Sequence, residues 1–573
     1  MNEKEFLLGP VRQTPKASRL RRAVLGGGVV AGLVVAAASL LRGLEGAGLY
    51  ASSPSRVPVD WTPCPANVDF QCGYLEVPKN YFNLSAGTAQ IAMLKVPSTA
   101  PPSERLGTIF LNPGGPGGSG VEFALRFGPS FSKLLRGRYD LLGFDPRGIG
   151  ASIPRVECFP STLEHELFKA GTVLERGFDL SKVTTPFKPC NPFSATGRLH
   201  LLDQHRQLQS LQQTQFELCG ERMGDDLNYM GTSTVVRDIE EMSRVLEGDA
   251  LINFFGGSYG TILGAYLVNM IPEKVGRVLI DGVASAPQWA NEPTYKWLAD
   301  WLAYTEKTFD WFLEDCSKAR QSSYCIFEQP ADNFPSLIGR ANELSIGEKP
   351  PGSWPHFAQV FADALAGNAT SLYNELVKPL HLNFPSHIQV DLSRAAVSCI
   401  DSPPYKSPKD WPTAEIMVEE TLHVLETASR HFGASINLIE PDGGCQYWPA
   451  TSPPERFIGP WNATLKTPML IVSNTADPIT PLSSGRELND LMGPSSRLLI
   501  QNSPGHCSLG SVSRCTMTKY RDYFLDGVLP PDEFMCEVDE RYFPGGEDVR
   551  SVGLMDDLAR DVSKAWRGYL ETL

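Results

Sequence analysis

A glycine-rich break in an apolar stretch is the feature that most constrains the fold of this chain. Residues 251–255 read as a buried strand, whereas the apolar residues of 262–267 recur at helical spacing. Between them, two glycines bracket Ser258 in the pattern G-x-S-x-G, which is typical of a strained turn that exposes a serine between a strand and a helix. An incidental serine in a glycine-rich turn fits the same short pattern. A nucleophilic role for Ser258 therefore requires partners elsewhere in the chain.

Apolar segments that end in turn residues predict a mostly parallel sheet of the α/β class. Helical patterns fall between most of these segments, as right-handed crossovers require. Residues 73–78 and 89–97 are expected to add an antiparallel hairpin at the sheet edge. The predicted parallel strands occupy residues 107–115, 139–148, 251–257, 277–283, 468–478 and 497–506.

Two long insertions interrupt the predicted strands. Residues 151–230 are rich in polar residues, and residues 285–455 carry Trp-rich, mostly helical patterns whose aromatic residues are expected to pack in a core. The second insertion is long enough to cap the carboxyl ends of the strands, where open α/β sheets bind ligands. The predicted domains are therefore a first core part at 60–284, a cap at 285–455 and a second core part at 456–573.

The amino-terminal region predicts a membrane segment. Residues 23–41 contain no charge and approach the roughly 20 apolar residues that a helix needs to cross a bilayer. Arginines precede this run, so the positive-inside rule places residues 1–22 in the cytosol. An uncleaved signal anchor is favoured because the run exceeds the usual signal core of roughly 7–15 residues. A cleaved signal peptide, and hence a secreted protein, is the alternative.

Cysteines and glycosylation sequons agree with a secretory lumen or an extracellular location for the rest of the chain. The chain has 12 cysteines, and the short spacings of Cys64/Cys72 and Cys316/Cys325 can close small loops as disulfides. The sequon N-x-[ST] predicts glycosylation at Asn83, Asn368 and Asn462.

Length, charge and ligand spacing exclude several classes of protein. The 573 residues, 42% of them apolar, allow one large domain with an insertion or two domains. A net charge of -14 argues against a nucleic-acid partner. Neither paired C-x-x-C spacing nor a histidine cluster is present, so no metal or other cofactor is expected. The sequence leaves the oligomeric state open.

Two later strands end in residues that can serve as the partners of Ser258. Asp477 follows the strand in LIVSNTADPITP, where a carboxylate can orient a histidine, and His506 follows the strand in LLIQNSPGH. The order Ser258, Asp477, His506 is the chain order of the α/β-hydrolase triad. Asp281 is the rival acid, and it is the weaker candidate because its strand runs directly into the cap insertion.

The chain resembles the tripeptidyl aminopeptidase and proline iminopeptidase family of α/β-hydrolases. NPGGPGGSG resembles the family's H-G-G-P-G loop, with Pro113 where histidine often stands; GFDPRGIGAS resembles its D-x-R-G-x-G-x-S segment, and GGSYG matches its elbow. AVSCID, CQYWP, TPMLIVSNTADPITP and SPGHCS are similar to its tripeptidyl-aminopeptidase-like carboxy-terminal region. The resemblance covers roughly residues 60–540. It implies an α/β-hydrolase fold whose mostly parallel sheet carries a large, mainly helical cap insertion.

The resemblance also implies hydrolysis through an acyl-enzyme, with release of short peptides or single residues from a free N-terminus. Ser258 would attack the carbonyl carbon, His506 would act as base and then as acid, and Asp477 would orient the imidazole. The backbone N–H groups of Tyr259 and Gly115 would bind the oxyanion.

An exopeptidase of this type needs an anion for the substrate's ammonium group. Asp401 in the SCID segment is the candidate, and the alternative is a loop carboxylate beside a Cys399–Cys445 disulfide. Because fold does not settle substrate, a carboxylic-ester or lactone hydrolase of small-molecule metabolism is the alternative function. A third hypothesis is a non-catalytic binding module on the same fold. The presence of all three triad candidates, Ser258, Asp477 and His506, disfavours it.

Overall fold

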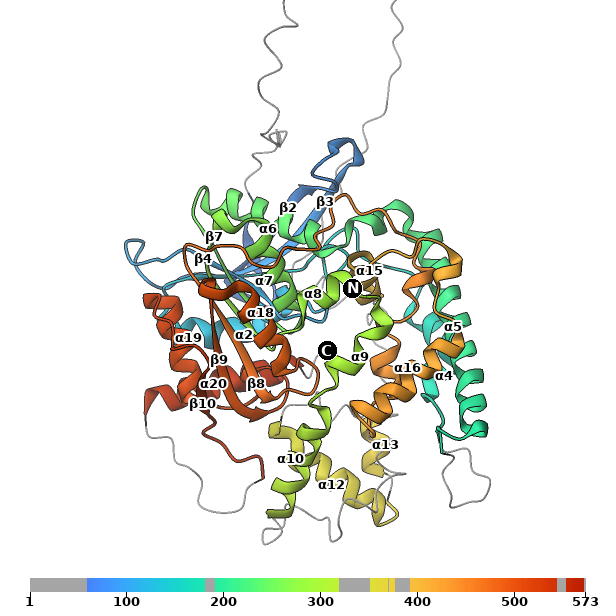
Figure 1. Ribbon diagram of the computed structural model, residues 1–573. Helices are drawn as coiled ribbons and strands as arrows, with labels where there is room; N and C mark the ends of the chain where they lie inside the picture. The colour runs from blue at the N-terminus through green and yellow to red at the C-terminus, as the bar shows by residue number, and fades with distance from the viewer. Residues whose placement is uncertain are drawn as a thin grey trace, which may run out of the picture.

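The computed structural model describes residues 59–180, 191–318, 351–368, 370–376, 392–543 and 553–570. Its centre is a 10-stranded sheet in the order β1-β2-β3-β5-β4-β6-β7-β8-β9-β10 (Figure 1). The strands are β1 Thr62–Cys64, β2 Asn67–Pro78, β3 Thr88–Val96, β4 Thr108–Asn112, β5 Asp140–Phe144, β6 Ile252–Gly257, β7 Val275–Asp281, β8 Met469–Ala476, β9 Ser496–Pro504 and β10 Phe534–Glu537.

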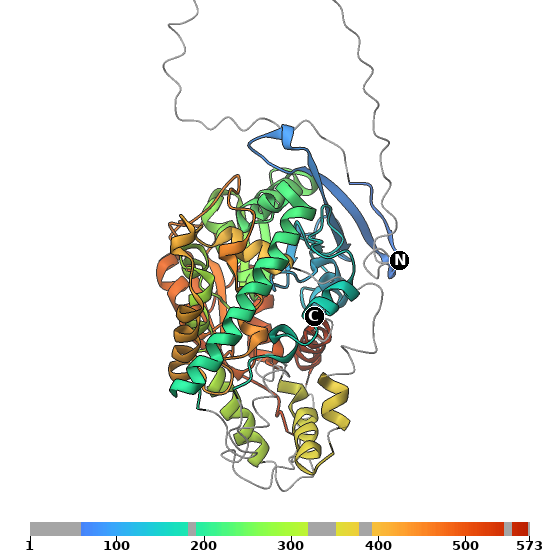
Figure 2. The same cartoon turned by 90° about the vertical axis from the view of Figure 1, so that its right-hand side faces the viewer.

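The pairing of these strands confirms the expected mostly parallel sheet. The run from β5 to β10 is parallel throughout. At the other edge β2 and β3 form the predicted antiparallel hairpin, which runs along the side of the molecule in Figure 2. Sequence analysis did not identify β10, which extends the parallel part beyond β9, or the short β1 that pairs with β2.

The strand order sets where a ligand can bind. From β4 the chain moves to β5, toward the β1 edge of the sheet. From β6 it moves to β7, toward the opposite, β10 edge. The connections therefore diverge between β4 and β6, and such a switch point leaves a crevice at the carboxyl ends of the strands. Ser258 follows β6 directly at this point.

Helices cover both faces of the sheet, and the central strands β4 and β6 are therefore buried on both sides. Successive side chains of a strand point to opposite faces, and accordingly Phe254 and Phe255 belong to two different hydrophobic clusters. The cluster around Phe254 includes side chains of α6 Thr232–Glu247, α7 Tyr259–Met270 and α18 Leu482–Met492. The cluster around Phe255 includes side chains of α2 Gly120–Leu134, α19 Arg514–Asp526 and α20 Leu554–Leu570.

The cap insertion between β7 and β8 contains helices and connecting loops but no strand among its described residues, and its helices gather beside the sheet in Figure 1. Thr305 Oγ1 and Thr308 Oγ1 each donate a hydrogen bond of 2.6 Å to a backbone carbonyl, of Pro478 and Ala476 respectively. The cap therefore rests on the carboxyl end of β8. Its helices are α8 Ala286–Asn291, α9 Leu298–Trp301, α10 Thr305–Lys318, α12 Trp354–Leu365, α13 Thr370–Leu376, α15 Ser393–Asp401, α16 Ala414–Thr427 and α17 Ile436–Ile439.

The two predicted insertions form one helical body. The first contains α3 Thr162–Lys169, α4 Val173–Arg176 and the long α5 Ala195–Met223, which crosses the view in Figure 2. Leu201 of α5 packs in one cluster with Val418, Leu422 and Leu425 of α16. Sequence patterns treated these insertions separately, because periodicity within one segment cannot show which other segment covers its apolar face.

Disulfides join several pairs of segments in the described residues. The predicted Cys64–Cys72 bond and the Cys399–Cys445 bond are present. Cys316 is disulfide-bonded, and its predicted partner Cys325 lies outside the described residues. Bonds that sequence analysis did not identify join Cys158 to Cys219 and Cys515 to Cys536. Disulfides persist in oxidising compartments, which indicates an extracellular or luminal protein.

The predicted membrane segment at 23–41 and the tail at 1–22 lie outside the described residues. None of the helices in the described ranges is both long and apolar enough to cross a bilayer. The asparagines of the predicted sequons are all exposed, at positions Asn83, Asn368 and Asn462.

Candidate active site

The serine turn has the strained geometry that its sequence pattern predicts. Ser258 adopts φ 56 and ψ -126 between β6 and α7, in a region that non-glycine residues rarely occupy. A Cβ on Gly256 would lie 2.2 Å from the carbonyl oxygen of Gly260, and a Cβ on Gly260 would lie 2.7 Å from that of Asn112. Both glycines are therefore required by close backbone contacts. The Ser258 N–H donates to the Asp281 carbonyl oxygen at 3.0 Å.

His506 and Asp477 meet at the carboxyl ends of neighbouring strands. Nδ1 of His506, which follows β9, lies 3.1 Å from each carboxylate oxygen of Asp477, which follows β8. Asp477 is fully buried and accepts further hydrogen bonds of 2.9 Å from the backbone N–H groups of Thr480 and Cys507. The carboxylate is thus fixed from several sides and holds the imidazole by its Nδ1 edge.

The same contacts set the charges of the pair. Burial alone would raise the pKa of Asp477, but the facing imidazole and the backbone N–H donors hold that pKa below its usual value. Burial disfavours a charged His506, yet the neighbouring Cys507 sulfur and the Asp477 carboxylate together raise the pKa of the imidazole well above its usual value. An imidazole beside such a carboxylate is a strong proton acceptor.

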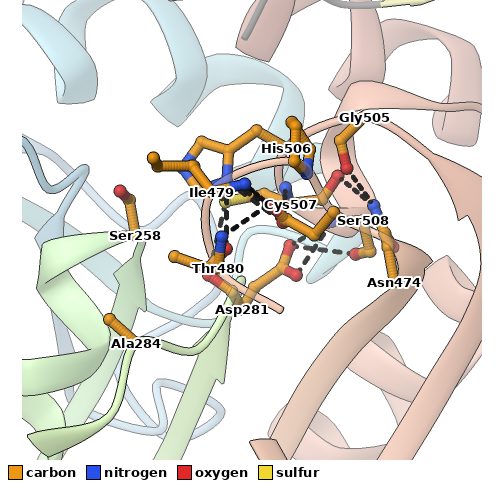
Figure 3. A network of polar contacts seen from close by, with 12 residues as sticks. Ser258, Asp281, Ala284, Asn474, Ile479, Thr480, Gly505, His506, Cys507 and Ser508 are labelled. Carbon is orange, nitrogen blue, oxygen red and sulfur yellow. Dashed lines mark hydrogen bonds and ion pairs between the residues drawn. The ribbon is translucent and has the colours of Figure 1, made fainter. Parts of the chain in front are cut away.

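Ser258 lies beside His506, with the Cys507 sulfur close to the imidazole (Figure 3). Among the described residues no hydrogen bond joins Ser258 to His506, and Nε2 of the imidazole lies 3.7 Å from Cys507 Sγ. Catalytic hydrogen bonds are often long in the absence of substrate. Burial raises the pKa of the Cys507 thiol to about 12, so this group is neutral at pH 7. Sequence analysis did not identify Cys507, although it directly follows the histidine.

The rival acid, Asp281, holds the backbone around the site. Its carboxylate accepts from the N–H and the Oγ of Ser508, both at 2.9 Å (Figure 3). Burial raises the pKa of Asp281 to about 6. Its hydrogen bonds go to the loop after His506, and its carbonyl oxygen holds Ser258. Of the two candidate acids, Asp477 is the one whose carboxylate contacts the imidazole.

The glycine loop after β4 lies directly against the serine turn. Gly114 has φ +104, and a Cβ at this position would lie 2.5 Å from Gly257 O, 2.7 Å from Ser258 Cβ and 2.9 Å from Tyr259 N. A side chain therefore cannot be placed at Gly114 without moving one of the two segments. This contact occurs where the chain connections diverge between β4 and β6.

The two predicted oxyanion donors are close to this contact. Tyr259 begins α7, and the first N–H groups of a helix lack intrahelical acceptors and favour negative charge nearby. Gly115 follows Gly114, and the loop is folded back by a hydrogen bond of 3.1 Å from Gly118 N to Gly114 O. An arrangement of this kind can stabilise an anion formed at the serine turn.

Asp401, the predicted amine-binding residue, lies in a buried network. It is 4% exposed. One of its carboxylate oxygens accepts from Thr232 N at 3.0 Å and the other from Trp289 Nε1 at 2.8 Å. Burial raises the pKa of Asp401 to about 6. Both oxygens are therefore engaged by protein donors, and the Cys399–Cys445 disulfide of the alternative interpretation lies nearby in the sequence.

Helix α20 packs against the segments that carry the site. Sequence analysis did not predict this contact. A Cβ on Gly257 would lie 2.9 Å from the Trp566 ring. Arg567 Nε donates to the carbonyl oxygen of Gly510 in the turn after the histidine at 2.9 Å. The Tyr569 hydroxyl donates to the backbone carbonyl at the N-cap of α2 at 3.5 Å. This one helix thus contacts the serine turn, the turn after the histidine and the start of α2.

In the part of the chain that the structure describes, no 3 side chains of His, Cys, Asp or Glu converge on a possible metal site. The chemistry that the described residues can supply is nucleophilic attack by a serine with a histidine as proton acceptor.

Comparisons with known proteins extend the similarity over most of the chain. Residues 432–536 match the family described as TAP-like protein. "Serine protease Hip1" of Mycobacterium tuberculosis is 25% identical over 562 residues, which cover 91% of this chain and 99% of that protein. "Tripeptidyl aminopeptidase" of Streptomyces coelicolor is 26% identical over 518 residues, with 86% and 89% covered. "Carboxylesterase B" of Mycobacterium tuberculosis is 26% identical over 555 residues, with 89% and 96% covered.

Replacing Gly114 with alanine tests the contact between the glycine loop and the serine turn. The new Cβ must displace the loop from Gly257 and Tyr259, so we expect a fluorophosphonate to label Ser258 about 100-fold more slowly, as after loss of one oxyanion donor. Gly87→Ala is the matched control, since Gly87 also has a positive φ, +95, but nothing within 4 Å of the added Cβ. Equal labelling rates of the two variants would show that the contact does not matter for reactivity.

Proposed function

We propose that this serine hydrolase, an α/β-hydrolase with a TAP-like carboxy-terminal region, is an aminopeptidase that releases short peptides or single residues from free N-termini. The observation that carries the proposal is that His506, hydrogen-bonded to Asp477, lies beside the strained Ser258 at one end of the sheet (Figure 3). The similarity to proteins named as a serine protease and a tripeptidyl aminopeptidase, over most of their length, supports a peptide substrate.

In the proposed mechanism Ser258 Oγ attacks the carbonyl carbon of the scissile peptide bond. His506 Nε2 takes the serine proton and then gives it to the leaving amine, while Asp477 holds Nδ1 and stabilises the imidazolium. The N–H groups of Gly115 and Tyr259 bind the oxyanion of each tetrahedral intermediate. Water, deprotonated by His506, then hydrolyses the acyl-enzyme and frees the serine.

A carboxylic-ester or lactone hydrolase is the second candidate function. It is favoured by the similarity to a protein named Carboxylesterase B, which covers nearly as much of this chain as the peptidase relatives do. The same serine, histidine and oxyanion donors serve both reactions, because the two differ in the leaving group and not in the attacked carbonyl. The substrate itself must therefore separate them.

A substrate profile of the full chain and of its Ser258→Ala variant tests the proposed activity. We expect release of the acyl part from tripeptidyl or aminoacyl amides that have a free N-terminus, and no release from the same amides after N-acetylation. Removing the nucleophile should lower kcat on the order of 10⁶-fold without changing thermal unfolding. Turnover of simple esters with none of the amides would establish the ester hydrolase instead.

Another prediction concerns the acid of the triad. We expect Asp477→Asn to lower kcat by about 10⁴-fold, because the amide no longer fixes the tautomer or stabilises the imidazolium. Loss of this negative charge also lowers the pKa of His506. The acid limb of the rate of fluorophosphonate labelling should therefore move to lower pH.

Asp281→Asn is the matched control for Asp477→Asn. Its carboxylate binds Ser508 and not the imidazole, so we expect lower thermal stability with a much smaller loss of kcat. A large loss of kcat in Asp281→Asn and a small one in Asp477→Asn would reverse the assignment of the acid.

We further propose that residues 23–41 anchor the protein as a single-pass signal anchor, with the hydrolase in the secretory lumen or outside the cell. The uncharged apolar run and the disulfides of the described chain support this placement. Exposure of Asn83, Asn368 and Asn462 is compatible with N-linked glycans at these positions.

Membrane extraction tests this topology. We expect the full chain to remain with membranes after carbonate washing, and glycosidase treatment to increase its gel mobility unless the three asparagines are changed to glutamine. A mature N-terminus mapped between residues 42 and 50 would instead identify the apolar run as a cleaved signal peptide.

A further inference from the structure

Helix α15 of the cap reaches both segments that carry the proposed oxyanion donors. Near its start, Arg394 Nη1 donates to the carbonyl oxygen of Gly115 at 3.4 Å. The Arg394 side chain is held by the Asp442 carboxylate, with Nη2 to Oδ2 at 2.6 Å. Asp401, the last residue of α15, lies at the other end. The cap is thus connected to the site through specific polar contacts as well as by covering it.

A buried chain of hydrogen bonds leads from Asp401 to Tyr259. The carboxylate accepts from both the N–H and the Oγ1 of Thr232, at the start of α6. Thr232 Oγ1 lies 2.6 Å from the Tyr259 hydroxyl. Because the threonine proton is already donated to Asp401, the tyrosine hydroxyl is the donor in this second bond. Thr232 is fully buried and Tyr259 is 4% exposed, so water does not compete for these bonds.

An aromatic contact reinforces this connection. The Trp289 ring lies 5.5 Å from the Tyr259 ring, measured between centroids, and its Nε1 donates to the same Asp401 carboxylate. Asp401 therefore positions two residues that contact the Tyr259 side chain. Three donors converge on this carboxylate, and an ionised carboxylate satisfies them because it only accepts hydrogen bonds.

We propose that Asp401 is a positioning residue, which through Thr232 and Trp289 fixes Tyr259 so that its backbone N–H faces the oxyanion. This inference rests on the proposed serine mechanism and assigns Asp401 a different task from amine binding. The Tyr259 ring is attached to the Cα whose N–H begins α7, so a shift of the ring moves the donor. Misplacement of a reacting group by about 1 Å can cost on the order of 100-fold in rate.

The two roles of Asp401 predict different kinetics. An amine-binding carboxylate acts on the KM of substrates with a free ammonium group and leaves substrates without one unaffected. A carboxylate that positions an oxyanion donor acts on the chemical step for every acyl substrate. A p-nitrophenyl ester without an amine, and a fluorophosphonate that labels Ser258, therefore report positioning alone.

The experiment compares substitutions along the hydrogen-bonded chain in the full-length protein. Asp401→Asn and Thr232→Val should each lower kcat on the p-nitrophenyl ester and the rate of fluorophosphonate labelling about 10- to 100-fold, with KM within about twofold. Thr232→Ser, which retains the hydroxyl, should restore near-normal rates. The double variant should be little slower than either single one, since both changes break the same connection.

Asp238→Asn supplies the matched control. Asp238 is likewise a buried carboxylate that accepts from a tyrosine hydroxyl, that of Tyr81 at 2.8 Å, and it also pairs with the buried Arg147. It is not among the residues assigned to the proposed mechanism. Its substitution should lower thermal stability without slowing labelling of the folded protein. If Asp238→Asn slowed fluorophosphonate labelling as much as Asp401→Asn does, the effect at Asp401 would be explained by general destabilisation, and the proposal would be overturned.

Two further results would also overturn it. The first is that Asp401→Asn leaves kcat on the ester unchanged and raises KM only for substrates that have a free N-terminus. That result would identify Asp401 as the amine-binding residue. The second is full activity of Thr232→Val. The labelling rate does not depend on the natural substrate, so a failure of the peptidase assignment leaves this test intact.

Discussion

The close contact between two backbone segments, the glycine loop after β4 and the serine turn after β6, is the constraint on which the site depends. Gly114 lies so near Ser258 that the loop carries no side chain there, and Ser258 itself occupies a backbone conformation that costs about 1–3 kcal/mol. The surrounding structure must offset this cost. The fully buried β6 and the hydrogen bond from Ser258 to Asp281 hold the turn in place.

Two buried carboxylates then bring the histidine to this contact. Asp477 and Asp281 end neighbouring strands, and they accept from consecutive backbone N–H groups, those of Cys507 and Ser508. The loop that carries His506 is thus fixed at two adjacent points. Asp281 also binds Ser258 through its carbonyl oxygen, so one residue connects the serine turn to the histidine loop while the other orients the imidazole.

Local sequence patterns predicted the parts of the fold that local patterns determine. The buried strands, the glycine-bracketed turn and the acid and histidine after β8 and β9 each have a signal within a few residues. The buried environment of Asp401 has none, because Thr232 and Trp289 are distant in the sequence and meet Asp401 only where the folded cap packs against α6. The neutral Cys507 thiol beside the imidazole likewise depends on burial, which neighbouring residues do not reveal.

Helix α20 follows all the other described elements in the chain, and yet Trp566 and Arg567 support the serine turn and the histidine loop. During synthesis the ribosome releases Ser258 and His506 well before these supports exist. The hydrolase therefore reaches its complete form only after its last described helix has been made and has docked.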